Sequence, residues 1–131
     1  MKIFIGQAVT GEDINKLREE SKKIVKILEE TGNDRYCTVL KGDEWEKNLL
    51  LGDKLKHAFN EVDKNDCFLA IVRSEKRSEG MLMEIGYAIS KNKKLILAIN
   101  ESVQNTYLRE MANKVIEFKT PDELNEKLKD I

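Results

Sequence analysis

One carboxylate, Glu84, stands among apolar residues in the segment 77–90, and this isolation makes it the side chain best suited to chemistry. The segment has helical periodicity, and the positions expected to face the core are Leu82, Ile85 and Ile89. Glu84 falls on the adjoining stripe of the same helix, beside the core. Because an unpaired buried carboxylate costs several kcal/mol, the chain either pairs Glu84 with a structural partner or uses it.

A polar loop leads into this helix through Ser78 and Gly80. The N–H groups at a helix start and the positive end of the helix dipole suit a bound anion and favour an ionised carboxylate. Met81 and Met83 are expected to shield Glu84 from bulk water. The segment therefore predicts an ionised, shielded carboxylate close to an anion site.

Short apolar runs alternate with longer helical patterns along the chain. Five runs are expected to be strands, at residues 2–5, 36–40, 67–72, 94–99 and 115–118. The first helix is expected to be capped by Thr10, and a later short helix to span 106–113. The last helix has Thr120 and Glu123 at the spacing of a capping box. A second helical region runs from Trp45 through Val62, with Gly52 as a candidate break.

This alternation predicts the fold class: a single α/β domain over residues 1–131, doubly wound like Rossmann or flavodoxin folds. The parallel sheet is expected to have five strands in the order 2-1-3-4-5. In such sheets the ligand crevice lies beyond the carboxyl ends of the strands, here between strands one and three. The loops leaving these strands supply the candidate substrate-binding residues, which are Gly6, Gln7, Thr10, Gly11, Ser78 and Gly80.

The motifs that carry a family resemblance are Gly6-Gln-Ala-Val-Thr-Gly11 after the first strand and Ser78-Glu-Gly-Met-Leu-Met-Glu-Ile-Gly-Tyr-Ala88, followed by Asn92-Lys-Lys-Leu-Ile-Leu97. With these motifs, residues 2–99 resemble the nucleoside 2-deoxyribosyltransferase superfamily, and most closely its 2′-deoxynucleoside 5′-phosphate N-hydrolase branch. The resemblance implies cleavage or transfer at an N-glycosidic bond, with Glu84 as the nucleophile. It also implies a nucleoside or nucleotide 5′-group held near Ser78, no cofactor, and a homodimer or larger assembly.

The chain departs from this family at three places. Many members carry an aspartate, thought to assist protonation of the leaving base, on the helix before strand three, where this chain has His57 and Ala58. The reference pKa of histidine suits proton transfer at neutral pH, so His57 is either the acid that replaces this aspartate or an ordinary surface histidine. The hydrolase branch tends to have an aromatic hydroxyl in strand one and an arginine in the first loop. This chain has Phe4 and no arginine there, so Lys76 or Arg77 is left to supply the charge, unless both are solvated loop residues.

Composition excludes several classes of function. The chain has 131 residues, 40% of them hydrophobic and 36% charged, with a net charge of −1, which describes a folded protein without a long-range field for nucleic acid or membrane. No apolar run approaches the length of a membrane span, so a cytoplasmic location is expected.

Cys37 and Cys67 lack a CxxC spacing and are expected to be buried free thiols. Two cysteines and one histidine also argue against a structural metal site.

Two other functions stay open beside the glycosidase. One is a noncatalytic nucleotide-binding module that kept the crevice. The other is cleavage of NAD, as in TIR-like domains, whose activity also depends mainly on one glutamate. Gly6 and Gly11 do not form GxGxxG, so the dinucleotide motif is not met. Trp45 is a candidate for stacking on a base or for packing with Leu49.

Overall fold

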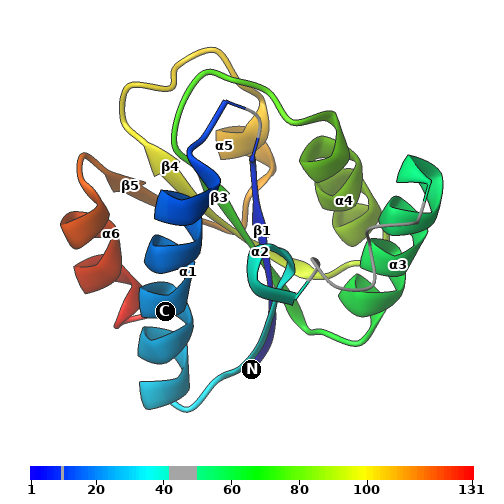
Figure 1. Ribbon diagram of the computed structural model, residues 1–131, viewed down its shortest axis with the longest axis horizontal. Coiled ribbons are helices and arrows are strands. Elements are labelled where there is room, and N and C mark those ends of the chain that lie inside the picture. The colour runs from blue at the N-terminus through cyan, green and yellow to red at the C-terminus, as the bar shows by residue number, and fades with distance from the viewer. Residues whose placement is uncertain (10, 42–49) are drawn as a thin grey trace.

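A five-stranded parallel sheet forms the centre of the computed structural model, which describes residues 1–9, 11–41 and 50–131 (Figure 1). Its strands are β1 (Lys2–Gln7), β2 (Asp34–Cys37), β3 (Cys67–Val72), β4 (Lys94–Asn100) and β5 (Lys114–Phe118). Their order, β2-β1-β3-β4-β5, confirms the predicted topology. β1 therefore lies beside β3, with Gly6 paired to Ala70 and Gln7 to Ile71.

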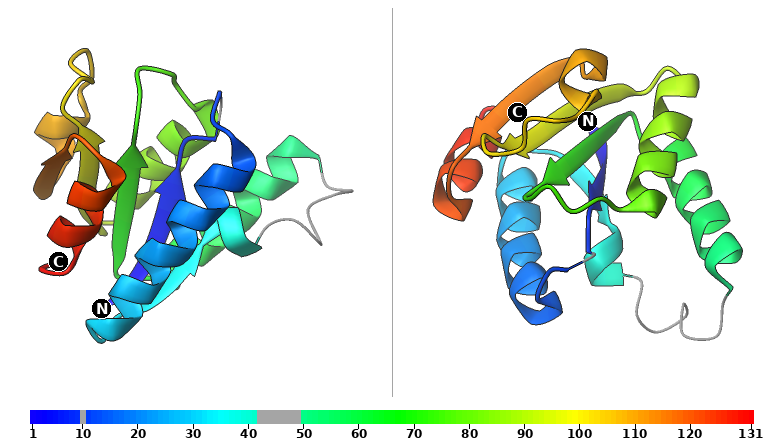
Figure 2. Two further views of the ribbon diagram at one scale, coloured as in Figure 1. Left: turned by 60° about the vertical axis from the view of Figure 1, so that its left-hand side comes forward. Right: turned by 90° about the horizontal axis from the view of Figure 1, so that it is seen from above.

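Helices cover both faces of this sheet (Figure 2). One face carries α1 (Ile14–Glu30) and α6 (Pro121–Leu128), whose apolar residues share a buried cluster with Ile3, Ile5 and Leu69. The other face carries α3 (Leu51–Asp63), α4 (Glu79–Ser90) and the short α5 (Leu108–Met111). Alternate side chains of β1, β3 and β4 enter the two clusters, as expected of parallel strands covered on both sides.

Short polar side chains fix where the helices begin. Asp13 is the N-cap of α1, and its Oδ1 accepts hydrogen bonds from the N–H groups of Asn15 and Lys16 at 2.9 and 3.2 Å. The expectation that Thr10 caps this helix is therefore wrong, and Thr10 itself lies outside the described residues. The Thr120 cap of α6 is confirmed, since its Oγ1 accepts from the N–H of Glu123 at 3.2 Å.

The second strand is shorter than predicted. β2 ends at Cys37, and α2 (Thr38–Lys41) follows directly. The strand expected at 36–40 is therefore confirmed at 36–37 and wrong at 38–40. Val39 belongs to this helical turn and is buried in the α1 face of the core. A short apolar run with a buried side chain fits a strand and a buried helical turn equally well, which explains the error. The helix expected at 106–113 is likewise limited to α5.

The buried face of α4 differs from the expected one. Met81, Ile85 and Ala88 are buried against the sheet, whereas Leu82 is 38% exposed. The expectation that Leu82 faces the core is therefore wrong, and Ile89 is only half-buried. Because α4 carries apolar residues on nearly every side, its periodicity does not single out one face.

Both cysteines lie in the core as free thiols, as predicted. Cys37 belongs to the cluster on the α1 side, and burial raises its thiol pKa. Burial also raises the pKa of Cys67 to about 11. Among the described helices, none combines the length and apolarity needed to cross a bilayer.

Candidate functional site

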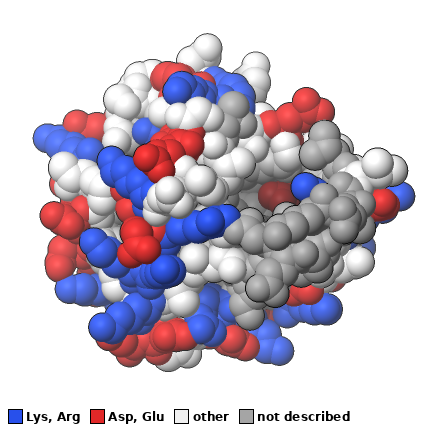
Figure 3. All heavy atoms as spheres, in the orientation of Figure 1, with Lys and Arg blue, Asp and Glu red and all other residues white. Residues whose placement is uncertain are grey.

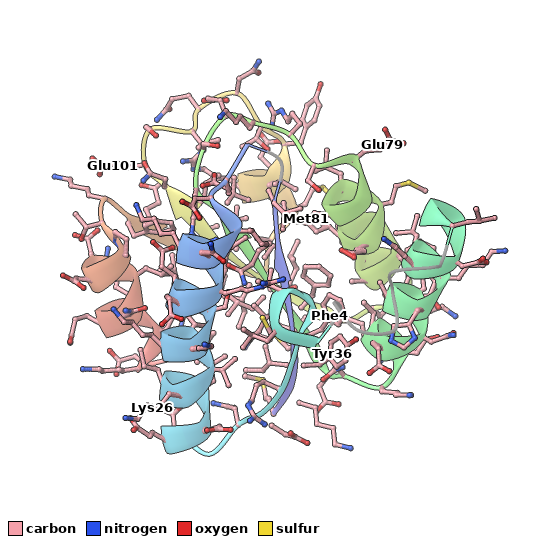
Figure 4. All side chains as sticks on the ribbon, viewed as in Figure 1. Phe4, Lys26, Tyr36, Glu79, Met81 and Glu101 are labelled. Carbon is pink, nitrogen blue, oxygen red and sulfur yellow. The ribbon has the colours of Figure 1, made fainter. Side chains whose placement is uncertain are left out.

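The ends of β1 and β3, where the sequence predicts the crevice, lie side by side at one edge of the sheet. Register places Gln7 opposite Ile71 at the last paired rung, and the loops that follow leave the same edge of the sheet. Figure 3 shows acidic side-chain atoms in a hollow at the right of the view, next to residues that are not described. In Figure 4, Met81 points from α4 towards the strands, and Glu79 points away from them.

Glu84 is half-buried on the side of α4 that faces α3. This side is identified by Tyr87, whose ring stacks on Phe59 of α3 at a centroid distance of 4.4 Å. Residues three apart on a helix are neighbours on one face, so Glu84 lies next to Tyr87, one turn closer to the helix start. The Tyr87 hydroxyl donates to the Asp63 carboxylate at 2.8 Å. This hydrogen bond holds α4 against the end of α3, one turn after Glu84.

Ser78 caps α4 and leaves its first turn open to an anion. Its Oγ accepts a hydrogen bond from the N–H of Met81 at 3.3 Å. The first hydrogen bond along the helix runs from the N–H of Leu82 to the carbonyl oxygen of Ser78. The N–H groups of Glu79 and Gly80 precede it, and a Cβ built on Gly80 meets no atom within 4 Å. This end of α4 therefore has donors, space and a positive dipole end.

Lys76 joins the two loops that border the crevice. Its Nζ donates to the carbonyl oxygen of Gly11 at 3.3 Å, and its aliphatic chain lies against the Gly11 backbone. Gly11 has a φ of +75°, and a Cβ there would lie 2.3 Å from Cδ of Lys76. The positive φ favours glycine at position 11, whereas the flexible Lys76 side chain could move away from a Cβ. The sequence suggested Lys76 or Arg77 as the basic group, and Lys76 is the one that lies between these loops.

The neighbouring residues of that loop point elsewhere. The Arg77 guanidinium donates to the backbone carbonyl of Asn105, in the segment before α5. Glu75 accepts a hydrogen bond from the N–H of Gln104 at 3.0 Å. Arg77 and Glu75 therefore anchor the loop to the segment before α5, which leaves Lys76 and Ser78 on the side of Gly11.

Gly6 lies against an aromatic cluster on the α4 side of the sheet. A Cβ at Gly6 would lie 2.5 Å from Cζ of Phe68, so the buried ring occupies the space of a side chain. Phe68 packs on Phe4 at a centroid distance of 4.9 Å. This close packing explains the glycine structurally, and contact with a substrate at Gly6 stays a prediction.

The Gln7 side chain lies on the opposite face of the sheet from Glu84. It is only 6% exposed, and its Nε2 donates to Oγ of Ser21 in α1 at 2.7 Å. Its Oε1 is buried and has no hydrogen-bond partner among the described residues. The structure therefore does not bring the Gln7 side chain to the crevice, where only its backbone is available.

Tyr36 is a residue that sequence reasoning missed. It pairs with Phe4 in the sheet register, and the two rings stack at a centroid distance of 5.6 Å. This hydroxyl lies 3.2 Å from Nε2 of His57. The predicted pairing of strands one and two brings Tyr36 close to Phe4, but it does not bring His57 of the following helix to the same place.

His57 lies on the side of α3 that faces the sheet edge. Phe59 faces α4, and His57 precedes it by two residues, about 200° around the helix. His57 accordingly meets Tyr36 of the edge strand β2 and lies 3.8 Å from Glu61. The structure thus places His57 against the edge strand, about 200° around α3 from Phe59.

A second polar group lies on the other face of the sheet, just after β3. Nε of Arg73 donates to Oε2 of Glu20 at 2.9 Å, and the two side chains are 14% and 16% exposed. Desolvation lowers the pKa of Arg73, and the charge of Glu20 opposes that change. A cavity of about 250 Å³ borders this pair, between the starts of α1 and α6.

Two expectations fall on residues outside the described part of the chain. Thr10, a candidate binding residue, and Trp45, a candidate for stacking, both belong to the residues that are not described. Among the described residues, no three His, Cys, Asp or Glu side chains are grouped to hold a metal ion.

Solved structures with a similar fold include enzymes that act on nucleosides and nucleotides. The CMP N-glycosidase BcmB of Clostridium botulinum superposes with a TM-score of 0.76 and 20% identity over 100% of both chains. A 2-deoxyribosyltransferase of Bacillus psychrosaccharolyticus has a TM-score of 0.66 and 15% identity, covering 98% of this chain and 96% of its own. One from Leishmania mexicana has a TM-score of 0.59 and 14% identity, covering 75% of this chain and 63% of its own.

The chain therefore has the fold of these enzymes, which confirms the fold implied by the sequence resemblance. No protein-family model matches the chain, and no curated protein matches its sequence. The likeness rests on the arrangement of strands and helices, because identities of 14–20% do not carry individual residues across.

Proposed function

We propose that this protein breaks the N-glycosidic bond of a nucleoside or its 5′-monophosphate, with Glu84 as the nucleophile. The observation that carries the proposal is the position of Glu84: a half-buried carboxylate in the middle of α4, the helix that follows β3 and is capped by Ser78. The likeness to a CMP N-glycosidase and to 2-deoxyribosyltransferases supports the same reaction class.

The chemistry suits a carboxylate in this place. A Glu84 oxygen attacks C1′ of the sugar while the C1′–N bond breaks, through a transition state with oxocarbenium character. The electron pair of the broken bond leaves with the base, and a sugar ester of Glu84 remains. Water then attacks C1′ and breaks the ester, and the proton that it loses balances the proton gained by the departed base; alternatively, a second base attacks C1′ and takes the sugar. Glu84 returns to its carboxylate form in either case.

The 5′-group is proposed to bind at the start of α4. The Ser78 hydroxyl and the N–H groups of Glu79 and Gly80 offer hydrogen bonds to phosphate oxygens, and the dipole of α4 adds a positive field. The Lys76 ammonium, hydrogen-bonded to Gly11, supplies a full positive charge between the two loops. A 5′-monophosphate is therefore the proposed form of the substrate, bound by Lys76, Ser78 and Gly80 with the Gly6–Gly11 loop against the sugar and base.

His57 is not assigned as the acid that protonates the leaving base. It contacts Tyr36 of the edge strand, and this pair of rings is proposed to hold Phe4 of β1 in place. If His57 were the acid, His57→Asn would lower the rate of base release and change its pH profile. We expect the pH profile of base release to be unchanged in His57→Asn.

The direct test is incubation with deoxynucleosides, their 5′-monophosphates, CMP and NAD, followed by chromatographic detection of free base. Release of a nucleobase from a monophosphate supports the proposal, and the preferred base identifies the substrate. Release of nicotinamide alone would favour NAD cleavage. Tight nucleotide binding without release of any base would favour the noncatalytic module.

A further inference from the structure

The cavity beside the Arg73–Glu20 pair lies on the opposite face of the sheet from α4. It has a volume of about 250 Å³ and is bordered by the starts of α1 and α6 and by the ends of β4 and β5. Figure 1 shows the two helices side by side at the left of the view. Pockets for drug-sized ligands usually have volumes of about 300–1,000 Å³, so this cavity suits a smaller molecule. We call it the α1–α6 cavity.

The α1–α6 cavity lies at the edge of the sheet where the parallel strands end. Arg73 and Ser74 directly follow β3, Asn100 is the last residue of β4, and Lys119 directly follows β5. Ligands of open parallel sheets bind at this edge, outside the carboxyl ends of the strands. The fold therefore offers a place for a second ligand on the face covered by α1 and α6.

Arg73 has a positively charged edge that is not used within the described part of the chain. Its Nε donates to Oε2 of Glu20 at 2.9 Å, whereas Nη1 and Nη2 are buried and have no hydrogen-bond partner among the described residues. These two nitrogens form the end of the planar guanidinium, and their parallel N–H groups match the two oxygens of a carboxylate. Because buried charged donors are costly to leave unpaired, this edge indicates a carboxylate that no described residue supplies.

Glu12 contributes an unpaired negative charge to the same cavity. It is half-buried, and no described residue forms an ion pair or hydrogen bond with its carboxylate. Desolvation lowers the pKa of Arg73, and the charges of Glu20 and then Glu12 oppose this change, so Glu12 lies near the guanidinium. The other two acids of the lining are already engaged, because Asp13 caps α1 and Glu20 binds Arg73. Glu12 is therefore the acceptor available to an ammonium group.

The lining combines balanced charges with an apolar part. Its charged residues are three acids and three bases, namely Glu12, Asp13, Glu20, Lys16, Arg73 and Lys119. Figure 3 shows acidic and basic side chains close together at the left of the view, over α1 and α6. Leu17, Phe118 and Leu124 are buried and supply the apolar part. A ligand with a single charge would disturb this balance, whereas a zwitterion with an apolar side chain keeps it.

We propose that the α1–α6 cavity binds a free amino acid with an apolar side chain, with its carboxylate on Arg73 and its ammonium group on Glu12. The side chain of the ligand packs on the three buried apolar residues of the lining. Because Nη1 and Nη2 are closed off from solvent, the ligand enters when a long exposed side chain of the lining, such as Lys16, moves aside. The site does not depend on the proposed reaction, since none of its residues is assigned to the crevice.

Isothermal titration calorimetry with L-leucine and two analogues tests the charge pairing. The analogue 4-methylpentanoate lacks the ammonium group, isoamylamine lacks the carboxylate, and both keep the apolar chain. We expect L-leucine to bind and to raise the melting temperature, and each analogue to bind at least about tenfold more weakly. The other apolar amino acids then identify the preferred side chain. Absence of binding by every apolar amino acid at millimolar concentration, or an analogue that binds as tightly as L-leucine, would overturn the proposal.

Variants of the lining locate the bound amino acid. Glu12→Gln should weaken L-leucine binding by about tenfold and leave 4-methylpentanoate binding unchanged, because only the ammonium group loses its partner. The double variant Glu20→Met with Arg73→Met removes the buried pair without leaving an unpaired charge, so it should fold and lose L-leucine binding. Glu19→Gln, at an exposed residue of α1 outside the cavity, should bind L-leucine as the parent does. Parental affinity for L-leucine in both Glu12→Gln and the double variant would overturn the proposal.

Discussion

The Lys76 ammonium donates a hydrogen bond to the carbonyl oxygen of Gly11, 65 residues away in the sequence and 3.3 Å away in space. This contact joins the loop after β1 to the loop after β3, at the switch point of the sheet. It holds a positive charge close to the Ser78 cap of α4. The two loops that the sequence assigned to one crevice are therefore in direct contact.

Replacing Lys76 should weaken phosphate binding selectively. Lys76→Met keeps the aliphatic chain and removes the charge, so we expect the Kd of a nucleoside 5′-monophosphate to rise about tenfold or more. The Kd of the corresponding nucleoside should change little. Arg77→Met is the matched control, because Arg77 binds the carbonyl of Asn105 and points away from this loop. Isothermal titration calorimetry that finds equal losses for both variants would contradict the role of Lys76.

Gly6→Ala should destabilise the fold. Its Cβ would meet the fully buried Phe68 ring at 2.5 Å, and overpacking of this kind costs about 1–3 kcal/mol. Gly52→Ala serves as the control, since a Cβ at that position of α3 meets no atom within 4 Å. Alanine there should raise the unfolding free energy by about 0.5–1 kcal/mol. Urea denaturation measures both, and a Gly6→Ala protein as stable as the parent would show that Phe68 moves freely.

The Arg73–Glu20 pair should contribute to stability more than an exposed pair. Glu20→Gln leaves the largely buried Arg73 guanidinium without its counter-charge, and we expect a loss of about 2 kcal/mol. Glu19→Gln removes the exposed pair with Lys22, whose side chains are 70% and 63% exposed, and should change stability by less than about 0.5 kcal/mol. Equal unfolding free energies for the two variants would contradict this assignment.

The Cys67 thiol should make the fold sensitive to alkaline pH. Its pKa rises from an ordinary value of 9.0 to about 11 in the fold, because burial disfavours the thiolate. The folded state therefore keeps its proton when the unfolded state loses it. Stability from this group is complete below pH 9 and is lost as the pH rises through 11, by about 1–2 kcal/mol. The slope of the unfolding free energy against pH above 9 should be shallower in Cys67→Ala, and an unchanged slope would refute the effect.

The topology and most element boundaries could be predicted from the sequence, because they depend on local signals. β3 matches its predicted range of 67–72, since an unbroken apolar run of that length fits a strand buried on both faces. The cap at Thr120 is equally local. The strand order followed from the doubly wound fold type, for which 2-1-3-4-5 is a common order, and needed no knowledge of tertiary contacts.

The errors occurred at residues whose burial or orientation is determined by tertiary contacts. α4 is apolar on nearly every side, so only its neighbours determine that Met81 is buried and Leu82 is exposed. Alternation along β1 determines that Gln7 faces α1, but the predicted strand ended at Ile5. The Tyr36–His57 contact joins an edge strand to a helix across two connections, and no local pattern in the sequence predicts such a contact.

Base release by Glu84→Gln tests the central proposal most directly. The amide keeps the size of the side chain and removes its charge, so we expect release of free base from the preferred substrate to fall by orders of magnitude. The melting temperature should stay unchanged or rise, because neutralising a reactive carboxylate removes a strained or poorly solvated charge. Glu126→Gln, an exposed residue of α6, controls for the substitution itself and should keep full activity. A Glu84→Gln protein that melts early yet still releases base would show that Glu84 is a structural residue and not the nucleophile.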